Sequence, residues 1–450
     1  MSRKIILKFI SIFFVSIQTL NPVFSQQTKT LTLIEAIDLS LKNSKQLKAG
    51  SARIDQAVAA VIDAENNRLP GFTVSGSYLR LLSPNVNLKI KSNNNNGGTG
   101  GTTGSTPKVS QALYGIANAS YPLYTGGRIR YGIESAKYLE EAAKLDVDNN
   151  KNAVVLNTMN AYTNLYKANA AIAVIKQNLE SSRQRDTSFS HLEQNGLLAR
   201  NDLLKTELQT SNIELNLLDA ENNRSLATIN MDLILGLPEN TEIIIDPNSF
   251  KTVSTTTAML DYEQLALQNR KDMQAVAYRK KAAETGIKSA RSLAYPNIVL
   301  TGGYVAADVP NLVTITNAIN AGIGVQYNLS SLWKKNSQLM LAKARVAEFE
   351  ANQEELYDAV RLEISEGYQN YHITLKKTEV YQKTLTQSEE NYRITKNKYD
   401  NSLVTINDLL DADVALLQAR LNVAAAQADA ILAYNKLLQT TGTLSSTYNK

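Results

Sequence analysis

The sequence predicts a mixed α and β membrane protein in which each chain supplies four strands to a β-barrel and long helices to a tube. Three observations lead to this fold class. The sequence is duplicated, each copy contains a pair of strand-like segments, and each pair is followed by an unusually long helical pattern. The 450 residues carry a net charge of +5, and their lysines and arginines are scattered, which excludes a nucleic-acid-binding surface.

The duplication becomes visible when the sequence is aligned on itself. Aligning Pro70 on Pro296 also aligns Gly76 with Gly302. Beyond a loop the alignment shifts once, and further pairs match: Leu123 with Leu329, Tyr162 with Tyr368, Asn195 with Asn401, Asn201-Asp202 with Asn407-Asp408, and Gly236 with Gly442. Because duplicated units complete each other's structure, we expect a first repeat over residues 26–236 and a second over 260–442. The Asn- and Gly-rich loop 92–105 exists only in the first copy and is expected to be flexible.

The N-terminal residues 1–25 are typical of a cleaved export signal. Basic residues are followed by an apolar run from Ile5 to Val15, which is too short to span a bilayer. No later segment reaches the roughly 18 apolar residues of a spanning helix. Residues 237–259 are expected to join the two repeats and to add a small strand or belt, and residues 443–450 are expected to form a mobile tail.

Each repeat opens with a helical pattern that ends at a proline. The patterns run over 33–69 and 261–295, and Pro70 and Pro296 end them because proline disfavours helix in the preceding residue. Each proline is followed by a predicted β-hairpin, over residues 71–124 in the first copy and 297–329 in the second.

The segment from Ile319 to Leu329 alternates most cleanly between apolar and polar residues. Its length fits the roughly 9 to 11 residues of a strand in a membrane barrel. Four strands cannot close a barrel, which needs about eight, and an open edge is not stable in lipid, so the chain must oligomerise. Several aromatic residues near strand ends are either membrane-interface residues or ordinary strand formers: Tyr114, Tyr121, Tyr124, Tyr327 and Trp333.

A long helical pattern without proline follows each hairpin, from Arg128 to about His191 and from Asn336 to about Lys398. Such lengths indicate coiled-coil packing. After a short loop, a return helix is expected to run from Asp202 to Gly236, and its counterpart from Asp408 to Gly442, with the glycines as C-caps.

The composition excludes most catalytic chemistry. The chain has no cysteine and only two histidines, His191 and His372. No nucleophile with a base, metal cluster or phosphate-binding loop can be assembled from the remaining residues, so we expect no enzyme activity, no metal site and no cofactor.

The duplicated helix-hairpin-helix plan and the segment Tyr121-Pro122-Leu123-Tyr124-Thr125-Gly126-Gly127 resemble the TolC family of outer-membrane efflux proteins. The resemblance covers essentially all of the chain after the export signal. It implies a homotrimer whose twelve strands form one barrel in outer-membrane lipid of a Gram-negative bacterium. The barrel would continue as a helical tunnel across the periplasm to a periplasmic adaptor protein and an inner-membrane transporter. The strand-helix elbow would comprise Pro70, Pro122, Gly126, Gly127 and Pro296.

The resemblance also implies a gate at the periplasmic end, formed by Asp408 and Asp411. Residues three apart lie on one helix face, so three chains would bring together six carboxylates that attract cations. The alternative role for these residues, and for Asp202, is to cap a return helix and complement its dipole. The implied tip and adaptor-contact residues are Asn195, Gly196, Leu197, Asp202, Asn401, Ser402, Leu403 and Thr405.

The sequence departs from the family pattern at three positions. Ser402 replaces the usual turn glycine, Val404 replaces the arginine that holds the closed tip in relatives, and Asn328 stands where the first copy has Pro122. The closed-state latch of relatives is therefore not expected in this chain.

The function implied is an exit channel for small molecules, such as drugs, toxic compounds or metal ions, in a tripartite efflux system. A first alternative is an exit duct for type I protein secretion on the same architecture. A second is a periplasmic coiled-coil scaffold whose apparent strands are loops. The cargo, the cognate pump and the adaptor are not specified by the sequence.

Overall fold

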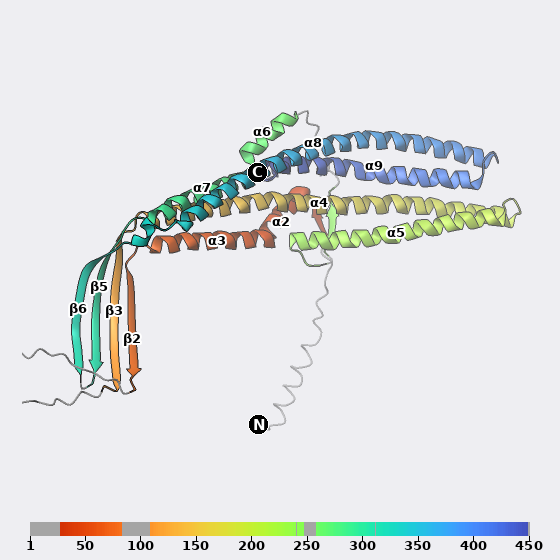
Figure 1. Ribbon diagram of the computed structural model, residues 1–450. Helices are drawn as coiled ribbons and strands as arrows, with labels where there is room; N and C mark the ends of the chain where they lie inside the picture. The colour runs from red at the N-terminus through yellow and green to blue at the C-terminus, as the bar shows by residue number, and fades with distance from the viewer. Residues whose placement is uncertain (1–27, 83–108, 240, 247–257, 311, 449–450) are drawn as a thin grey trace, which may run out of the picture. The chain divides into compact units, whose positions relative to one another are not determined.

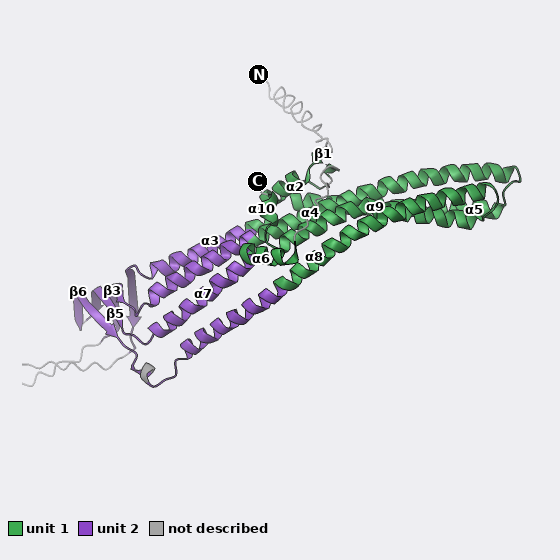
Figure 2. Ribbon diagram, turned by 90° about the horizontal axis from the view of Figure 1, so that it is seen from above, with its two compact units in different colours: residues 1–48, 149–270, 360–450 green, residues 49–148, 271–359 purple. Residues whose placement is uncertain are grey.

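The computed structural model describes residues 28–82, 109–239, 241–246, 258–310 and 312–448 (Figure 1). The expected export signal and the loop 92–105 lie outside these residues, as does much of the segment that joins the repeats. The chain divides into two compact units (Figure 2). Unit 1 comprises Met1–Lys48, Asn149–Arg270 and Val360–Lys450, and unit 2 comprises Ala49–Asp148 and Lys271–Ala359. Both units therefore contain segments from both sequence copies.

Unit 2 contains a four-stranded antiparallel sheet in the order β2-β3-β5-β6. Figure 1 shows the four strands side by side. The strands are β2 (Gly71–Arg80), β3 (Gln111–Tyr124), β5 (Asn297–Val309) and β6 (Val313–Gln326). Four helices contribute to this unit: α3 (Lys45–Asn66), the first part of α4 (Arg128–Gln194), α7 (Lys271–Ser292) and the first part of α8 (Ser337–Asp400).

The last strand ends earlier than the predicted second hairpin. After β6, a short 3-10 helix, η2 (Leu329–Leu332), replaces the strand expected to reach residue 329. The reason is local, because the Asn328 side chain accepts a hydrogen bond from the Ser330 backbone N–H at 3.2 Å and starts the turn.

Unit 1 is a helical body with a small parallel sheet of β1 (Thr28–Leu31) and β4 (Glu242–Ile245). Its core includes Leu31, Ile37, Met159, Tyr162 and Leu235. The fully buried Tyr162 hydroxyl donates to the Leu31 backbone carbonyl at 2.9 Å, which ties the sheet to α4. The remaining helices are α2 (Leu33–Asn43), α5 (Arg200–Leu235), α6 (Met259–Asn269), α9 (Ile406–Thr440) and α10 (Leu444–Tyr448).

The helix that opens each repeat is broken, which corrects the expectation of one continuous helix. Ser44 separates α2 from α3 with ψ of 118°, and its hydroxyl accepts from the Leu47 backbone N–H at 3.2 Å. Arg270 separates α6 from α7 with ψ of 120°. Its guanidinium is buried and donates to Glu363 at 2.6 Å and to the Thr440 carbonyl at 3.1 Å. In both copies the side chain of the residue at the break forms hydrogen bonds there, and these hydrogen bonds stabilise the interrupted helix.

The expected mobile tail is wrong for residues 444–448, which form α10. Leu444 is fully buried in the main core of unit 1. The Ser445 backbone N–H donates to Asn152 Oδ1 at 2.8 Å, and the Tyr448 hydroxyl donates to Asn435 Oδ1 at 2.9 Å. Apolar burial and these two hydrogen bonds fix the segment. Within the described part of the chain, no helix is long and apolar enough to cross a membrane.

Candidate functional site

The strand register gives the sheet of unit 2 one continuous apolar face. Residues directly opposite each other in an antiparallel pair lie on the same face. Ile323 of β6 pairs with Leu300, Leu300 pairs with Tyr121, and Ala119 pairs with Phe72. The face therefore crosses all four strands. Its members are Phe72, Val74, Tyr78, Leu113, Ala117, Ala119, Tyr121, Ile298, Leu300, Tyr304, Ile319, Ala321, Ile323 and Val325.

This apolar face is open to the surroundings of the chain. Val74 is 85% exposed, Ile319 is 80% exposed and Val325 is 68% exposed. A contiguous exposed apolar surface of this extent marks contact with a membrane or a partner. The sequence predicted this character for β6 alone, and the register extends it to β2, β3 and β5.

The opposite face of the sheet is mainly small and polar. Thr73 pairs with Asn118, and Ser120 pairs with Thr301. Gly303 fits between two amides, because a Cβ there would lie 2.8 Å from the side-chain oxygens of Asn118 and Asn320. The two faces thus have the opposite polarities expected of a barrel strand with one side toward lipid and one toward water.

The sheet is joined to α4 by a tight elbow that requires glycine. Gly126 has φ of +64°, and a Cβ there would lie 2.7 Å from the Ser292 carbonyl oxygen. Gly127 has φ of +88°, and its Cβ would lie 2.9 Å from the Tyr131 ring. Pro122 lies in β3 where the pairing with β5 shifts register. Pro70 and Pro296 directly precede β2 and β5.

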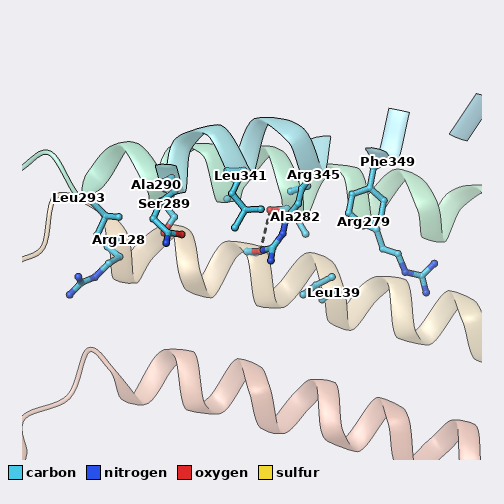
Figure 3. A pocket seen from close by; sticks show the side chains of 15 residues that line it. Arg128, Leu139, Arg279, Ala282, Ser289, Ala290, Leu293, Leu341, Arg345 and Phe349 are labelled. Atoms are coloured by element: carbon cyan, nitrogen blue, oxygen red, sulfur yellow. Dashed lines mark hydrogen bonds between the residues drawn. The ribbon is translucent and has the colours of Figure 1, made fainter. Parts of the chain in front are cut away.

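The described residues of unit 2 line a cavity at the elbow and another among the helices. The larger, about 610 Å³, lies at the elbow between the end of α3, the end of β3 and the first turn of α4. The smaller, about 380 Å³, lies among α4, α7 and α8 and is lined by Arg128, Arg279 and Arg345 with leucine and alanine side chains (Figure 3). Arg279 forms an ion pair with Asp146.

Unit 1 contains the two helical hairpins that carry the predicted tip residues. Both turns have the same geometry. Gly196 has φ of +73° and Ser402 has φ of +58°. The next residue donates back to the helix in each case, from Leu197 N–H to the Leu192 carbonyl and from Leu403 N–H to the Lys398 carbonyl, each at 2.8 Å. Ser402 therefore adopts a backbone conformation that favours glycine.

The tip leucines lack apolar cover from their own chain. Leu197 is 74% exposed and Leu403 is 72% exposed. Asn195 and Asn401 each donate a side-chain hydrogen bond to the carbonyl four residues earlier, at 2.7 Å in both turns. The two turns thus present matching exposed leucines on rigid backbones.

The return helices differ in their caps, because the aspartate takes part in capping α9 but not α5. The N-cap of α5 is Ala199, which makes no side-chain cap hydrogen bond, and Asp202 forms an ion pair with Lys205 at 3.2 Å. The N-cap of α9 is Thr405, which forms a capping box with Asp408. Asp202 and Asp408 thus lie in the first turn, where a negative charge favours the helix dipole.

The two predicted gate residues have different surroundings. Asp408 Oδ2 accepts from the Thr405 backbone N–H at 2.8 Å and from its hydroxyl at 2.7 Å. These hydrogen bonds hold the pKa of the Asp408 carboxyl below its ordinary value. Asp411 is also exposed, and its carboxylate has no hydrogen-bond or ion-pair partner among the described residues. Asp411 is therefore the more available of the two for a cation or a partner.

A small apolar cluster joins the two hairpins near their tips. It contains Phe189 of α4, Leu203 of α5, and Ile406 and Leu409 of α9. The Phe189 and Tyr399 rings stack with centroids 5.6 Å apart. Burial and, to a lesser extent, the nearby Asp202 and Asp400 raise the pKa of the Tyr399 phenol.

A buried polar network lies next to this cluster and was not anticipated from the sequence. Arg185 of α4 donates to Asp413 Oδ2 of α9 at 3.0 Å, and their side chains are only 10% and 7% exposed. Asn178 donates to the other Asp413 oxygen at 3.3 Å. Arg185 also donates to Ser182 Oγ at 2.9 Å, and Ser182 is hydrogen-bonded to Thr210 of α5. The network therefore links α4, α5 and α9.

A signal for this network does exist in the sequence. On α4 the apolar seam Ile175, Leu179, Phe189 is interrupted at Ser182 and Asp186, which have the same three-and-four spacing. Polar residues in a coiled-coil seam indicate a partner across the interface. The partner of Ser182 and Asp186 is Thr210 of α5. Asp413 pairs with Arg185 from 228 residues away in the sequence, and this pair was identified only from the structure.

The comparisons with known proteins agree with this geometry. The family model described as "Outer membrane efflux protein" matches residues 36–237 and 263–443, more than half of the chain. The chain belongs to the outer membrane efflux protein family. The two matched segments correspond to the two sequence repeats.

Individual relatives are distant but match over nearly their full length. The outer membrane protein TolC of Vibrio cholerae is 23% identical over 430 residues, 92% of this chain and 91% of the relative. The Campylobacter jejuni CmeC outer membrane channel has a TM-score of 0.75 at 19% identity, covering 92% of this chain and 86% of that one. The open state of the Neisseria gonorrhoeae MtrE outer membrane channel has a TM-score of 0.71 at 17% identity, covering 91% and 88%.

Membership in this family confirms the predicted fold class, a mixed α and β membrane protein with barrel strands and long tunnel helices. The protein is an outer-membrane efflux channel of a Gram-negative bacterium and extends into the periplasm. Because the family consists of channels, the prediction that the chain is not an enzyme is also confirmed.

Proposed function

We propose that three copies of this chain form the outer-membrane exit channel of a tripartite efflux system that exports small molecules such as drugs, toxic compounds or metal ions. The observation that carries this proposal is the sheet of unit 2, with one continuous exposed apolar face and one mainly polar face. An apolar outer face and a polar inner face are what a water-filled barrel in lipid requires.

Assembly into a trimer is supported by the outer strands and by the helices. β2 and β6 are the outer strands of the sheet, and three sheets of four strands would close a twelve-stranded barrel without free edges. In unit 1, α5 carries a row of exposed leucines, and α8 carries more widely spaced exposed apolar residues. These residues are Leu204, Leu208, Leu215, Leu218, Leu226 and Leu233 on α5, and Leu362, Ile373, Val380 and Ile394 on α8. A neighbouring copy would cover both rows as coiled-coil seams.

The hairpin tips are proposed to contact the periplasmic adaptor protein, and through it the inner-membrane transporter. The exposed Leu197 and Leu403 offer two matching apolar contacts on turns whose backbones are already fixed by hydrogen bonds. Fixed turns lose little conformational freedom on binding, which favours docking.

Asp408 and Asp411 are proposed to line the narrow end of the tunnel. Six carboxylates from three chains would attract cations and bind divalent ions. Asp408 is already occupied by its capping box with Thr405, so Asp411 should carry most of the ion binding. Replacing Asp411 with alanine should weaken divalent-ion block in planar-bilayer recordings more than replacing Asp408 does. Unchanged block in both variants would leave these residues with a structural role only.

A deletion strain complemented with the wild-type gene provides the test of function. Increased sensitivity to drugs or metal salts, restored by complementation, is the expected result. Loss of a secreted polypeptide without altered drug sensitivity would favour the type I secretion duct instead. Release of the protein from membranes by carbonate, together with the absence of a heat-modifiable oligomer on gels, would favour the coiled-coil scaffold and refute the channel.

A further inference from the structure

The elbow cavity of unit 2 has no part in the exit pathway described above. Its lining residues are Arg68, Tyr121, Pro122, Leu123, Tyr124, Thr125, Gly127, Ile129, Arg130 and Ile133. We propose that this cavity binds the phosphate group of a phospholipid headgroup in the membrane leaflet that faces the periplasm.

The position of the cavity relative to the apolar face supports a site at headgroup depth. Tyr121 pairs with Leu300, and Tyr124 pairs with Ile298, so both rings belong to the apolar side of the sheet at its elbow end. They are 41% and 44% exposed. Tyrosines at the end of a lipid-facing surface sit at the level of the headgroups, with the ring in apolar surroundings and the hydroxyl in water. The cavity beside them therefore lies where headgroup phosphates are found.

The charge of the cavity is suited to an anion. Arg68 follows α3 and Arg130 lies in the first turn of α4, and both are exposed. Among the residues that the structure describes, neither guanidinium has an ion-pair or hydrogen-bond partner, whereas nearby Lys137 is paired with Glu65 at 2.9 Å. None of the described lining residues is acidic. Guanidinium groups match phosphate oxygens in a bidentate geometry, which makes a phosphate the best-fitting anion.

The apolar part of the lining distinguishes a lipid from inorganic phosphate. Leu123, which is 49% exposed, lines the cavity together with Ile129 and Ile133. These side chains offer contact to the glycerol backbone and the first methylenes of the acyl chains, which can then continue along the apolar face of the sheet. Inorganic phosphate would use the two arginines but none of these apolar contacts.

The cavity in Figure 3 supplies a matched control. It also contains exposed arginines, Arg128 and Arg345, but none of its lining residues belongs to the apolar face of the sheet. Arg345→Gln therefore removes one positive charge from the same unit without touching the elbow cavity, and it is the charge-matched control for the single variants Arg68→Gln and Arg130→Gln.

The test is native mass spectrometry of the purified oligomer titrated with dioctanoyl phosphatidylglycerol and, separately, with inorganic phosphate. Arg68→Gln/Arg130→Gln should lower lipid affinity on the order of tenfold or more, because each arginine contributes charge-assisted hydrogen bonds. Arg68→Lys/Arg130→Lys should lie between the double glutamine variant and wild type, since lysine keeps the charge but not the bidentate geometry. Arg345→Gln should bind as wild type does.

Three results would overturn the proposal. The first is equal lipid binding by wild type and Arg68→Gln/Arg130→Gln while both remain oligomeric on gels. The second is an equal loss of binding in Arg345→Gln. The third is displacement of the lipid by inorganic phosphate at the same concentration, which would assign the cavity to free phosphate. Oligomer formation is followed in every variant, so a failure of this proposal is distinguishable from a failure of assembly.

Discussion

Removing one partner of the buried Arg185–Asp413 pair should be among the most damaging single changes to the helical hairpins. Asp413→Ala leaves the Arg185 guanidinium, whose side chain is 10% exposed, without its carboxylate. Breaking a buried pair in this way costs about 3–5 kcal/mol, because an uncompensated charge remains in surroundings of low dielectric. The exposed pair Arg183–Glu214, at 2.7 Å with side chains 58% and 46% exposed, is the matched control. Glu214→Ala should cost less than about 1 kcal/mol.

Hydrogen exchange of the purified protein provides the assay, read on peptides that cover residues 409–417 of α9. Asp413→Ala should speed exchange there by about a hundredfold or more, at tenfold for each 1.4 kcal/mol, and Glu214→Ala by less than about tenfold. The double variant Arg185→Met/Asp413→Leu should exchange nearly as slowly as wild type, because replacing both partners with apolar side chains leaves no unpaired charge buried. If the double variant is as labile as Asp413→Ala, or if Asp413→Ala matches Glu214→Ala, desolvation does not govern this pair.

Three further predictions concern the hairpin tips. Ala199→Thr should stabilise α5 by about 1 kcal/mol, because it would build with Asp202 the capping box that Thr405 and Asp408 form in the other copy; an unchanged unfolding midpoint in denaturant would contradict this. Ser402→Gly should stabilise the second turn by roughly 0.5 kcal/mol, because φ of +58° is strained for serine. Gly196→Ser should destabilise the first turn for the same reason. Equal unfolding midpoints in denaturant for wild type and both variants would refute the strain argument. The pKa of the Asp408 carboxyl is lowered in the folded protein, so Asp408 should stabilise α9 fully above the ordinary carboxyl pKa. This stabilisation should disappear as the pH falls through the lower folded pKa. Hydrogen exchange in the first turn of α9, corrected for its intrinsic pH dependence, should therefore rise in that acidic range in wild type but not in Asp408→Asn.

The order and length of the elements were largely predictable, because proline, glycine and periodicity mark them locally. The two long helices and the two hairpins begin and end within a few residues of their expected positions, although β6 starts and ends earlier than the segment Ile319 to Leu329. The breaks at Ser44 and Arg270 were not predictable. The helical periodicity continues through both positions, and Arg270 depends on Glu363 and Thr440, which are distant in the sequence.

Features of the candidate site were predictable only where the residues that define them lie in one continuous segment of the sequence. The alternation in β6 indicated a two-faced strand, but the extension of its apolar face to Phe72 and Val74 of β2 depends on the register of three strand pairs. The aspartates of the return helices were correctly placed in the first turn. The capping role holds for Asp408, whose carboxylate accepts from the Thr405 backbone N–H in a capping box, and is wrong for Asp202, which forms an ion pair with Lys205 instead. The N-cap residue of α9 is Thr405, because its hydroxyl reaches the backbone N–H of the third helical residue.

The interleaving of the two sequence copies has a consequence for biogenesis. Each compact unit combines early and late stretches of the chain, so contacts between residues hundreds of positions apart must form before either unit is complete. A polypeptide that has emerged only as far as its first copy contains no finished folding unit, and its leucine-rich helices stay without cover. Such a chain is a natural client for holding chaperones until the remainder arrives.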